Sequence, residues 1–173
     1  TWGVDVVPIG KDGSILGMPR AYRDPYTVGA PEKYFEIVPR EEVYNKTGIQ
    51  IMNFNSVFQL DTLRRNRCSA LEAADKILFI PDALAYLLTG ERVTEYTIAS
   101  TAQMIDPRTQ LWDDDILSLL GLRPDHFGRM VHPGQQIGTL TEEVQRLTGL
   151  GAVPVIAVAS HDTGSAVAAV PME

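Results

Sequence analysis

Cysteine and histidine are scarce in this sequence of 173 residues. Its one cysteine, Cys68, cannot form a disulfide within the chain. The three histidines, His126, His132 and His161, are scattered and lack the close Cys/His spacing of a zinc site. We therefore expect no disulfide framework and no metal site, and the cytoplasm is the expected compartment.

Positive charge is also in short supply. The chain has 15 Lys and Arg against 22 Asp and Glu, which gives a formal net charge of −7. No cluster of basic residues is present, and phosphate backbones bind mainly to concentrated positive charge. The sequence therefore predicts no nucleic-acid partner and favours metabolic chemistry on a small molecule.

Long hydrophobic runs are missing as well. The longest nearly uncharged stretch, residues 153–172, is interrupted by Pro154, His161, Asp162 and Pro171, so no membrane span is predicted. Neither G-x-x-x-x-G-K-[ST] nor G-x-G-x-x-G occurs, which excludes a recognisable cradle for nucleotide phosphates.

What is present is the composition of an ordinary globular domain, with 45% hydrophobic and 21% charged residues. The sequence opens at Thr1, without an initiator methionine, and enters an apolar run at once. We therefore expect an internal piece of a longer protein.

The first part of the chain predicts a hairpin and short helices. Residues 1–9 are rich in β-branched side chains, and the Asp12-Gly13 pair is a strong hairpin signal, so residues 14–18 should form the second strand. The charge-rich residues 32–44 then suggest one or two short helices that end near Thr47-Gly48.

Longer helices are expected next. Residues 54–67 place apolar side chains among polar ones, with Asn55-Ser56 as the cap. Apolar residues continue over 70–90, where Pro81 and Gly90 bracket the second helix.

The remainder of the chain predicts short helices and one strand. Helices are expected over 94–103, over 112–120 and from Thr141 onward. Residues 153–160 read as an apolar strand buried on both faces, followed by a helix over 165–170. One hairpin beside this strand makes too little sheet to cover it on both faces. Either further strands therefore lie outside this chain, or a partner supplies them.

The sequence Ser160-His161-Asp162-Thr163-Gly164 is the first candidate for chemistry. It follows the predicted strand at its carboxyl end, where reactive side chains of α/β proteins gather. Asp162 is well placed there to act as a general base that accepts a proton from an alcohol. The competing interpretation is that Asp162 only caps the next helix and His161 is a satisfied polar residue.

Other candidates are weaker by themselves. Trp2 and Gly3 could form a platform for a sugar face, although a Trp at the start of a strand is more often part of a core. Tyr22 and Asn55 could donate hydrogen bonds to hydroxyls. The run Asp113-Asp114-Asp115 is better explained as acids at a helix start than as metal ligands, because consecutive residues cannot all face one ion.

Taken together, the motifs resemble the FGGY carbohydrate kinases, with the same order from the first residue to the last. The segments that carry the resemblance are T-W-G-V-D (1–5), Y-R-D (22–24), T-G-I-Q (47–50), F-N-S-V-F-Q-L (54–60), P-D-A-L-A-Y-L-L-T-G (81–90), E-Y-T-I-A-S-T-A-Q (95–103), H-P-G (132–134) and V-A-S-H-D-T-G-S-A-V (158–167). Met52-Asn53 departs from the family, where a Leu-Pro pair is common, and this difference falls at the expected sugar pocket.

The resemblance implies an α/β fold of the ribonuclease H-like, actin-like ATPase type. It implies that residues 1–173 are the amino-terminal, sugar-binding domain of a two-domain kinase, without its phosphate-loop strands and without its nucleotide-binding domain. The implied reaction is transfer of the ATP γ-phosphate to the 1-hydroxyl of L-rhamnulose in rhamnose catabolism. ATP and Mg²⁺ would be used by the full-length enzyme, and this chain alone should bind neither and be inactive.

The resemblance also assigns roles to individual residues. Asp162 matches the general base, His161 a neighbouring sugar contact and Gly3 a backbone contact to the ketose. The residues that fall around the substrate in related kinases are Trp2, Asp5, Tyr22, Phe54 and Asn55.

Two alternatives stay open. The chain could belong to another FGGY kinase, such as a fuculokinase or xylulokinase, or to a non-catalytic sugar-binding module. An unpaired strand edge could in addition recruit a second copy of the chain.

Overall fold

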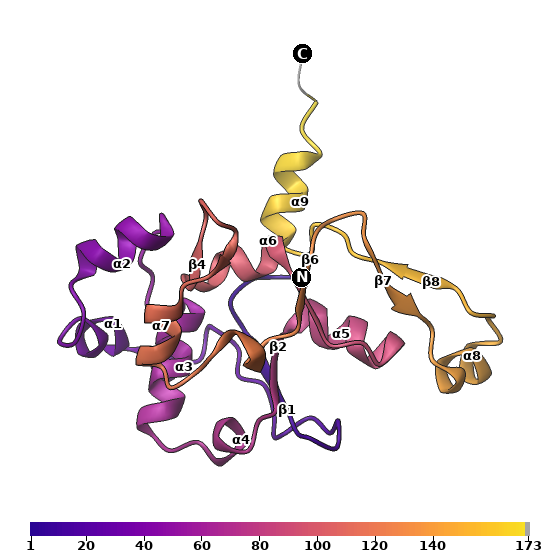
Figure 1. Cartoon of the computed structure of the whole chain (residues 1–173), viewed down its shortest axis with the longest axis horizontal. Helices are drawn as coiled ribbons and strands as arrows, with labels where there is room; N and C mark the ends of the chain where they lie inside the picture. The colour runs from indigo at the N-terminus through magenta and orange to yellow at the C-terminus, as the bar shows by residue number, and fades with distance from the viewer. Residues whose placement is uncertain (172–173) are drawn as a thin grey trace.

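The computed structural model describes residues 1–171, and its centre is a set of short strands (Figure 1). Strand β1 (Val6–Ile9) pairs antiparallel with β2 (Lys76–Phe79), with Val6 opposite Phe79. Strand β3 (Val93–Glu95) pairs parallel with β6 (Arg129–Val131). A parallel bridge between Ile77 and Phe127 joins the two pairs, so segments far apart in sequence meet in one layer.

The strand β2 corrects the helix expected to run on from residue 70. Helix α4 (Ser69–Glu72) is only one turn long, and β2 follows it before α5 (Ile80–Thr89) begins. The run Lys76–Phe79 is too short for its periodicity to separate strand from helix, and pairing with β1 decides in favour of strand. Pro81 and Gly90 bracket α5 as predicted, and Gly90 takes a left-handed φ of 75°.

The expected hairpin forms only in part. The turn at Asp12-Gly13 is present, and the amide of Gly10 donates to the carbonyl of Ser14 at 2.8 Å. The returning segment makes a single bridge, between Ile15 and Ile9, before Gly17 turns the backbone to a φ of +75°. β1 therefore pairs along its full length with β2, about seventy positions later in the chain, and not with residues 14–18.

Helices surround these strands, and most lie close to the predicted positions. Gly48 ends the predicted short helices with a left-handed φ of 66°, and Asp113 caps a predicted helix by accepting from the amide of Ile116 at 2.9 Å. The helices of this part are η1 (Pro25–Thr27), α1 (Ala30–Tyr34), α2 (Arg40–Thr47), α3 (Ser56–Arg65), α6 (Tyr96–Ala99), η2 (Ser100–Ala102), α7 (Asp114–Leu119) and η3 (Pro124–His126). A small antiparallel pair, β4 (Ile105–Asp106) and β5 (Leu111–Trp112), precedes α7.

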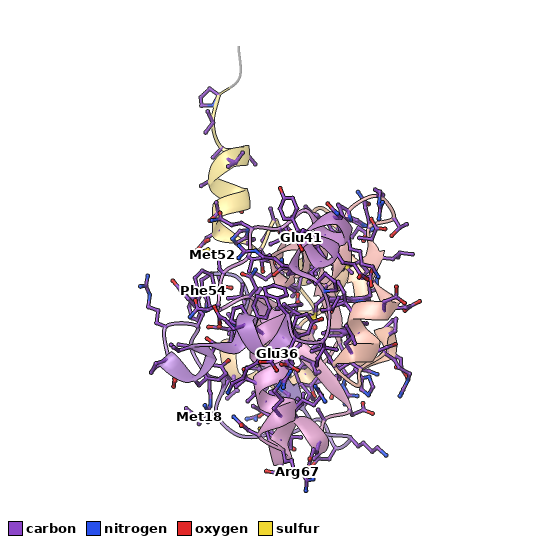
Figure 2. The ribbon with its side chains drawn as sticks, turned by 90° about the vertical axis from the view of Figure 1, so that its left-hand side faces the viewer. Met18, Glu36, Glu41, Met52, Phe54 and Arg67 are labelled. Atoms are coloured by element: carbon purple, nitrogen blue, oxygen red, sulfur yellow. The ribbon has the colours of Figure 1, made fainter. Side chains whose placement is uncertain are left out.

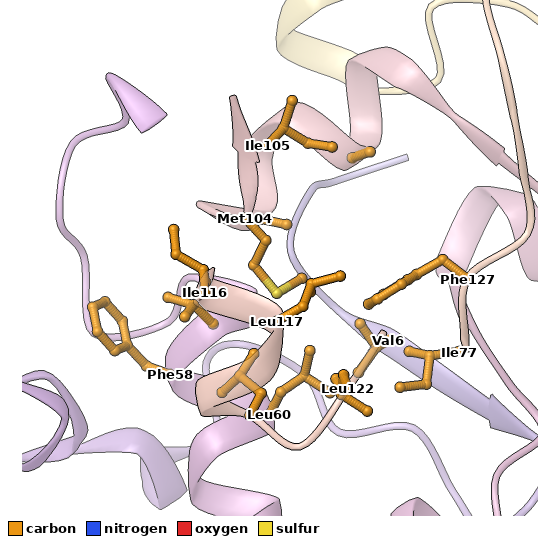
Figure 3. Close-up of a cluster of buried hydrophobic side chains, with 14 of the residues drawn as sticks. Val6, Phe58, Leu60, Ile77, Met104, Ile105, Ile116, Leu117, Leu122 and Phe127 are labelled. Carbon is orange, nitrogen blue, oxygen red and sulfur yellow. The ribbon is translucent and has the colours of Figure 1, made fainter. Parts of the chain in front are cut away.

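The main core lies between α3, α7 and the inner strands (Figure 3). Phe58 and Leu60 of α3 are fully buried with Ile77 of β2, Met104 and Leu117. Each such side chain removed from water contributes about 1.5–3 kcal/mol. This core fixes the amino-terminal end of α3, and Phe54 and Asn55, just before the helix, line the site described below.

The chain from β7 onward extends away from this core (Figure 1). Strands β7 (Gln136–Thr139) and β8 (Pro154–Ile156) pair antiparallel around α8 (Glu142–Thr148), and α9 (Asp162–Ala168) follows. None of the residues of α9 is buried.

The prediction that residues 153–160 are buried on both faces is wrong for this structure. Ile156 is 45% and Val158 is 65% exposed, while Ala157 of the same segment is buried. Within residues 1–171, β8 pairs with β7 alone, so one of its edges has no strand partner. Self-association through such an edge stays a prediction. None of the helices described is long and apolar enough to cross a bilayer.

Candidate functional site

Five segments of the chain enclose a cavity of about 590 Å³. Seven of the eight predicted site residues line it, and Asp5 alone does not. Figure 2 shows Met52 and Phe54 of this lining below α9, whose first residue is Asp162. The lining residues are Trp2, Gly3, Val4, Tyr22, Ile49, Gln50, Met52, Phe54, Asn55, Ser100, Thr101, His161, Asp162 and Thr163.

The segment before β1 forms one wall, and it packs tightly on Thr101. A Cβ added to Gly3 would lie 2.9 Å from Oγ1 of Thr101 and 3.0 Å from its Cγ2, so glycine is needed for this approach. The amide of Val4 donates to the same Oγ1 at 3.1 Å. Thr101 is thus part of the site, although the sequence reasoning did not single it out.

Asp5 lies behind this wall and is 2% exposed. Its Oδ2 accepts from Nε1 of Trp2 at 2.7 Å and from the amide of Tyr22 at 3.0 Å, and its Oδ1 accepts from Nε2 of Gln59 at 3.0 Å. The carboxylate therefore holds two lining residues in place and does not face the cavity. This placement gives Asp5 a supporting position behind the lining, and its contact with a sugar stays a prediction.

Aromatic and apolar side chains form the second wall. The rings of Tyr22 and Phe54 are tilted against each other, with centroids 5.2 Å apart. Trp2 and Met52 keep 44% and 38% of their surface exposed. Aromatic faces of this kind suit the apolar face of a sugar.

Asn55 is 3% exposed and reaches the cavity at its edge. It stands at the predicted cap position of α3, but its side chain makes no cap bond. Nδ2 of Asn55 instead donates to the carbonyl of Gln50 and to Oε1 of Gln103, both at 2.8 Å. The side-chain amide of Asn55 thereby links the loop at Gln50 to Gln103. Both bonds are expected, because buried polar groups need hydrogen-bond partners.

Asp162 lies at the rim of the cavity with its side chain 61% exposed. Its Oδ1 accepts from the amide of Thr163 at 2.7 Å and from Oγ1 of Thr163 at 3.2 Å. Nε2 of His161 is 3.8 Å from the same oxygen. His161 occupies the cap position of α9 and makes no side-chain cap bond, while Asp162 stands at the first helical position and binds a first-turn amide through Oδ1.

The chemical consequence of this geometry is straightforward. Within the described residues, Oδ2 of Asp162 has no hydrogen-bond partner among the side-chain contacts, so an acceptor oxygen is available at the cavity rim. An ionised carboxylate can take a proton from a hydroxyl held there. No group of three or more His, Cys, Asp or Glu able to hold a metal ion occurs between residues 1 and 171.

A buried pair of acids lies beneath the rim, and sequence reasoning missed both. Glu95 ends β3 and is 2% exposed, and its amide donates to Oδ1 of Asp82 at 3.0 Å. Asp82 is also 2% exposed, and its Oδ2 lacks a hydrogen-bond partner. Burial, with a smaller effect of the charge on Glu95, raises the pKa of Asp82 to about 8.

The raised pKa of Asp82 predicts a falling stability between pH 4 and 8. In that window the folded state keeps the proton while the unfolded state, with a pKa of 3.8, has lost it, so folding is penalised as pH rises. The slope from this group is at most about 1.4 kcal/mol per pH unit. We expect Asp82→Asn to remove it in urea titrations followed by tryptophan fluorescence, while Asp114→Asn, at an exposed position, leaves it unchanged. Equal slopes in the wild type and Asp82→Asn would contradict the prediction.

Comparison with known proteins places this chain in a family. A model of the amino-terminal domain of the FGGY family of carbohydrate kinases matches residues 1–169. The chain belongs to the FGGY family of carbohydrate kinases. The predicted family is thereby confirmed.

Curated relatives support a closer relationship. The chain is 69% identical over 171 residues to a rhamnulokinase of Bacteroides thetaiotaomicron, covering 99% of this chain and 35% of that protein. It is 42% identical over 173 residues to a rhamnulokinase of Ligilactobacillus salivarius, covering 100% of this chain and 35% of the relative. The chain is thus a rhamnulokinase homologue that spans about a third of the length of the curated relatives it matches.

Solved structures of other kinases share the fold. A gluconate kinase from Lactobacillus acidophilus aligns with a TM-score of 0.84 at 19% identity, over 91% of this chain and 32% of that one. A glycerol kinase from Plasmodium falciparum, solved with ADP, aligns with a TM-score of 0.76 at 18% identity, over 90% of this chain and 32% of that one. The predicted α/β fold of the actin-like ATPase type is confirmed.

Proposed function

We propose that this chain is the sugar-binding part of a kinase that transfers the γ-phosphate of ATP to the 1-hydroxyl of L-rhamnulose. The observation that carries the proposal is the cavity, which joins the aromatic wall of Trp2, Tyr22 and Phe54 to the carboxylate of Asp162. The 69% identity to a rhamnulokinase supports L-rhamnulose as the substrate.

In this proposal the described residues hold the ketose and take up its proton. Trp2, Tyr22 and Phe54 bind the apolar sugar face, while Gly3 and His161 contact it from the backbone side and the rim. As the oxygen of the 1-hydroxyl forms its bond to the γ-phosphorus, the bond from that phosphorus to ADP breaks, and the hydroxyl proton passes to the carboxylate of Asp162. Positioning of this kind supplies much of the rate in phosphoryl transfer.

The proposal assigns ATP and Mg²⁺ to parts of the longer protein. Within residues 1–171 no cluster of metal ligands occurs, so no step is assigned to a metal on this chain. The chain should bind the ketose weakly and should not turn over on its own. We place the full-length kinase in the cytoplasm, because the single cysteine of these 173 residues cannot form a disulfide within them.

An assay of ADP release tests the proposal directly. The full-length gene product is incubated with ATP, Mg²⁺ and, in turn, L-rhamnulose, L-fuculose, D-xylulose and glycerol, and the 173-residue chain serves as the parallel sample. We expect the highest kcat/KM with L-rhamnulose and no turnover by the chain alone. A preference for L-fuculose or D-xylulose would assign another kinase specificity, and no ADP release with any sugar would leave a binding module as the better description.

A further inference from the structure

The segment that carries Asp162 has few contacts of its own with the body of the protein. Helix α9, which begins at Asp162, buries none of its residues, and it projects from the rest of the chain (Figure 1). Packing of this helix therefore does not determine where the Asp162 carboxylate lies. Its position comes from bonds at the start of the helix: the amide of Asp162 donates to the carbonyl of Thr1 at 2.8 Å, and the residues just before it are also held.

A buried carboxylate binds Ser160, two residues before Asp162, through both its amide and its hydroxyl. Oε2 of Glu95 accepts from the amide of Ser160 at 3.1 Å and from Oγ of Ser160 at 2.6 Å. The amide of His161 adds a longer bond of 3.4 Å to Oγ1 of Thr97. Two hydrogen bonds to a buried charged group, 65 positions away in sequence, thus fix the backbone two residues before Asp162.

The same carboxylate also fixes the opposite wall of the cavity. It accepts from the amide of Thr97 at 2.8 Å, from Oγ1 of Thr97 at 2.5 Å and from the amide of Ile98 at 3.2 Å, which caps α6. Helix α6 continues directly into η2, whose Ser100 and Thr101 line the cavity. Glu95 is 2% exposed, and its five hydrogen bonds offset the cost of burying the charge.

We propose that Glu95 is a positioning residue, which sets the distance between the Asp162 carboxylate and the Thr101 wall through its bonds to Ser160. The inference rests on the proposed function and deepens it. A displacement of about 1 Å between a reacting group and its catalyst can lower a rate by about 100-fold. Glu95 makes its five hydrogen bonds to Thr97, Ile98 and Ser160 and none to Trp2, Tyr22 or Phe54, so the effect should fall mainly on kcat and less on KM.

Two variants of the full-length gene product separate this role from capping. Glu95→Gln keeps the shape of the side chain but removes one of its acceptor oxygens. Ser160→Ala removes only the 2.6 Å bond and leaves the cap of α6 complete. We expect kcat for L-rhamnulose to fall about 10- to 100-fold in Glu95→Gln and about 5- to 10-fold in Ser160→Ala, with KM changed less than about 3-fold. Glu36→Gln, at an exposed position, is the matched control and should retain full activity.

A double variant and a measurement without catalysis complete the test. If Glu95 acts through Ser160, the double variant should lose no more activity than Glu95→Gln alone. Hydrogen exchange of the amides of residues 158–163 should be faster in both single variants, whether or not the protein is active. Full kcat in Ser160→Ala, or unchanged exchange in both variants, overturns the inference. Failure of the wild type to phosphorylate any ketose overturns the proposed function instead, and the exchange data then still judge the position of this segment.

Discussion

Replacing Asp162 with asparagine should lower kcat of the full-length kinase about 10²- to 10⁴-fold, which is the usual contribution of a general base. The amide keeps the size of the carboxylate and can still accept from Thr163 through its remaining oxygen. It cannot take up the proton of the sugar 1-hydroxyl. The loss should therefore appear in the chemical step.

Sugar binding should survive this change, because the walls of the cavity come from other segments. Titration calorimetry with L-rhamnulose should give a Kd within about 3-fold of the wild type, since only a rim contact is altered. Asp114→Asn, at an exposed position of α7, serves as the control and should not affect kcat. Wild-type turnover in Asp162→Asn would rule out this carboxylate as the base.

The second large effect concerns folding, and it arises at Gly128. A Cβ at this position would lie 2.4 Å from the carbonyl carbon of Val93 and 2.6 Å from the carbonyl oxygen of Arg92. Both are backbone atoms, so no change of side-chain rotamer can relieve the clash. Gly128→Ala must push β3 away from β6, which begins one residue later.

We expect Gly128→Ala to lower the free energy of unfolding by about 3 kcal/mol or more, the upper range for overpacking. This corresponds to a fall of roughly 10 °C in Tm for a chain of this size. Gly151→Ala is the matched control, because no atom lies within 4 Å of its added Cβ and its φ is not positive. It should change Tm by less than about 2 °C, and equal Tm values for the two variants would show that β3 and β6 do not pack as described.

Loss of β3 would also reach the site, because this strand ends at Glu95. Gly128→Ala should therefore reduce kinase activity even where the protein remains folded. Asp162→Asn removes the reacting carboxylate, whereas Gly128→Ala disturbs β3, the strand that ends at Glu95 and thereby positions Asp162.

Much of the fold could be predicted from local patterns. Asp113 at the start of α7, Gly48 at the end of α2 and the Pro81 and Gly90 pair around α5 act through the backbone of their own turn, so the sequence signals were sufficient. The run Lys76–Phe79 was not predictable in this way. Its four residues fit helix or strand, and the choice depends on β1, which lies about seventy positions earlier.

The candidate site shows the same division. Seven of the eight proposed residues line one cavity, because the motifs that carry the family resemblance lie in the segments that enclose it. The sequence contained no signal that would separate Asp5, which is buried behind Trp2, from its exposed neighbours. Thr101 and Glu95 were missed because their importance lies in contacts with Gly3 and Ser160, which are distant in sequence.

The sequence by itself determined the family, the helix ends and the residues that gather around the cavity, because caps, turns and motifs act over a few neighbouring positions. The tertiary structure alone decided that β2 is a strand, that β8 leaves Ile156 and Val158 exposed, and that Asp5 and Glu95 support the site from behind. These features depend on which surfaces meet after folding. Burial and pairing between distant segments are properties of the assembled chain, and no local pattern encodes them.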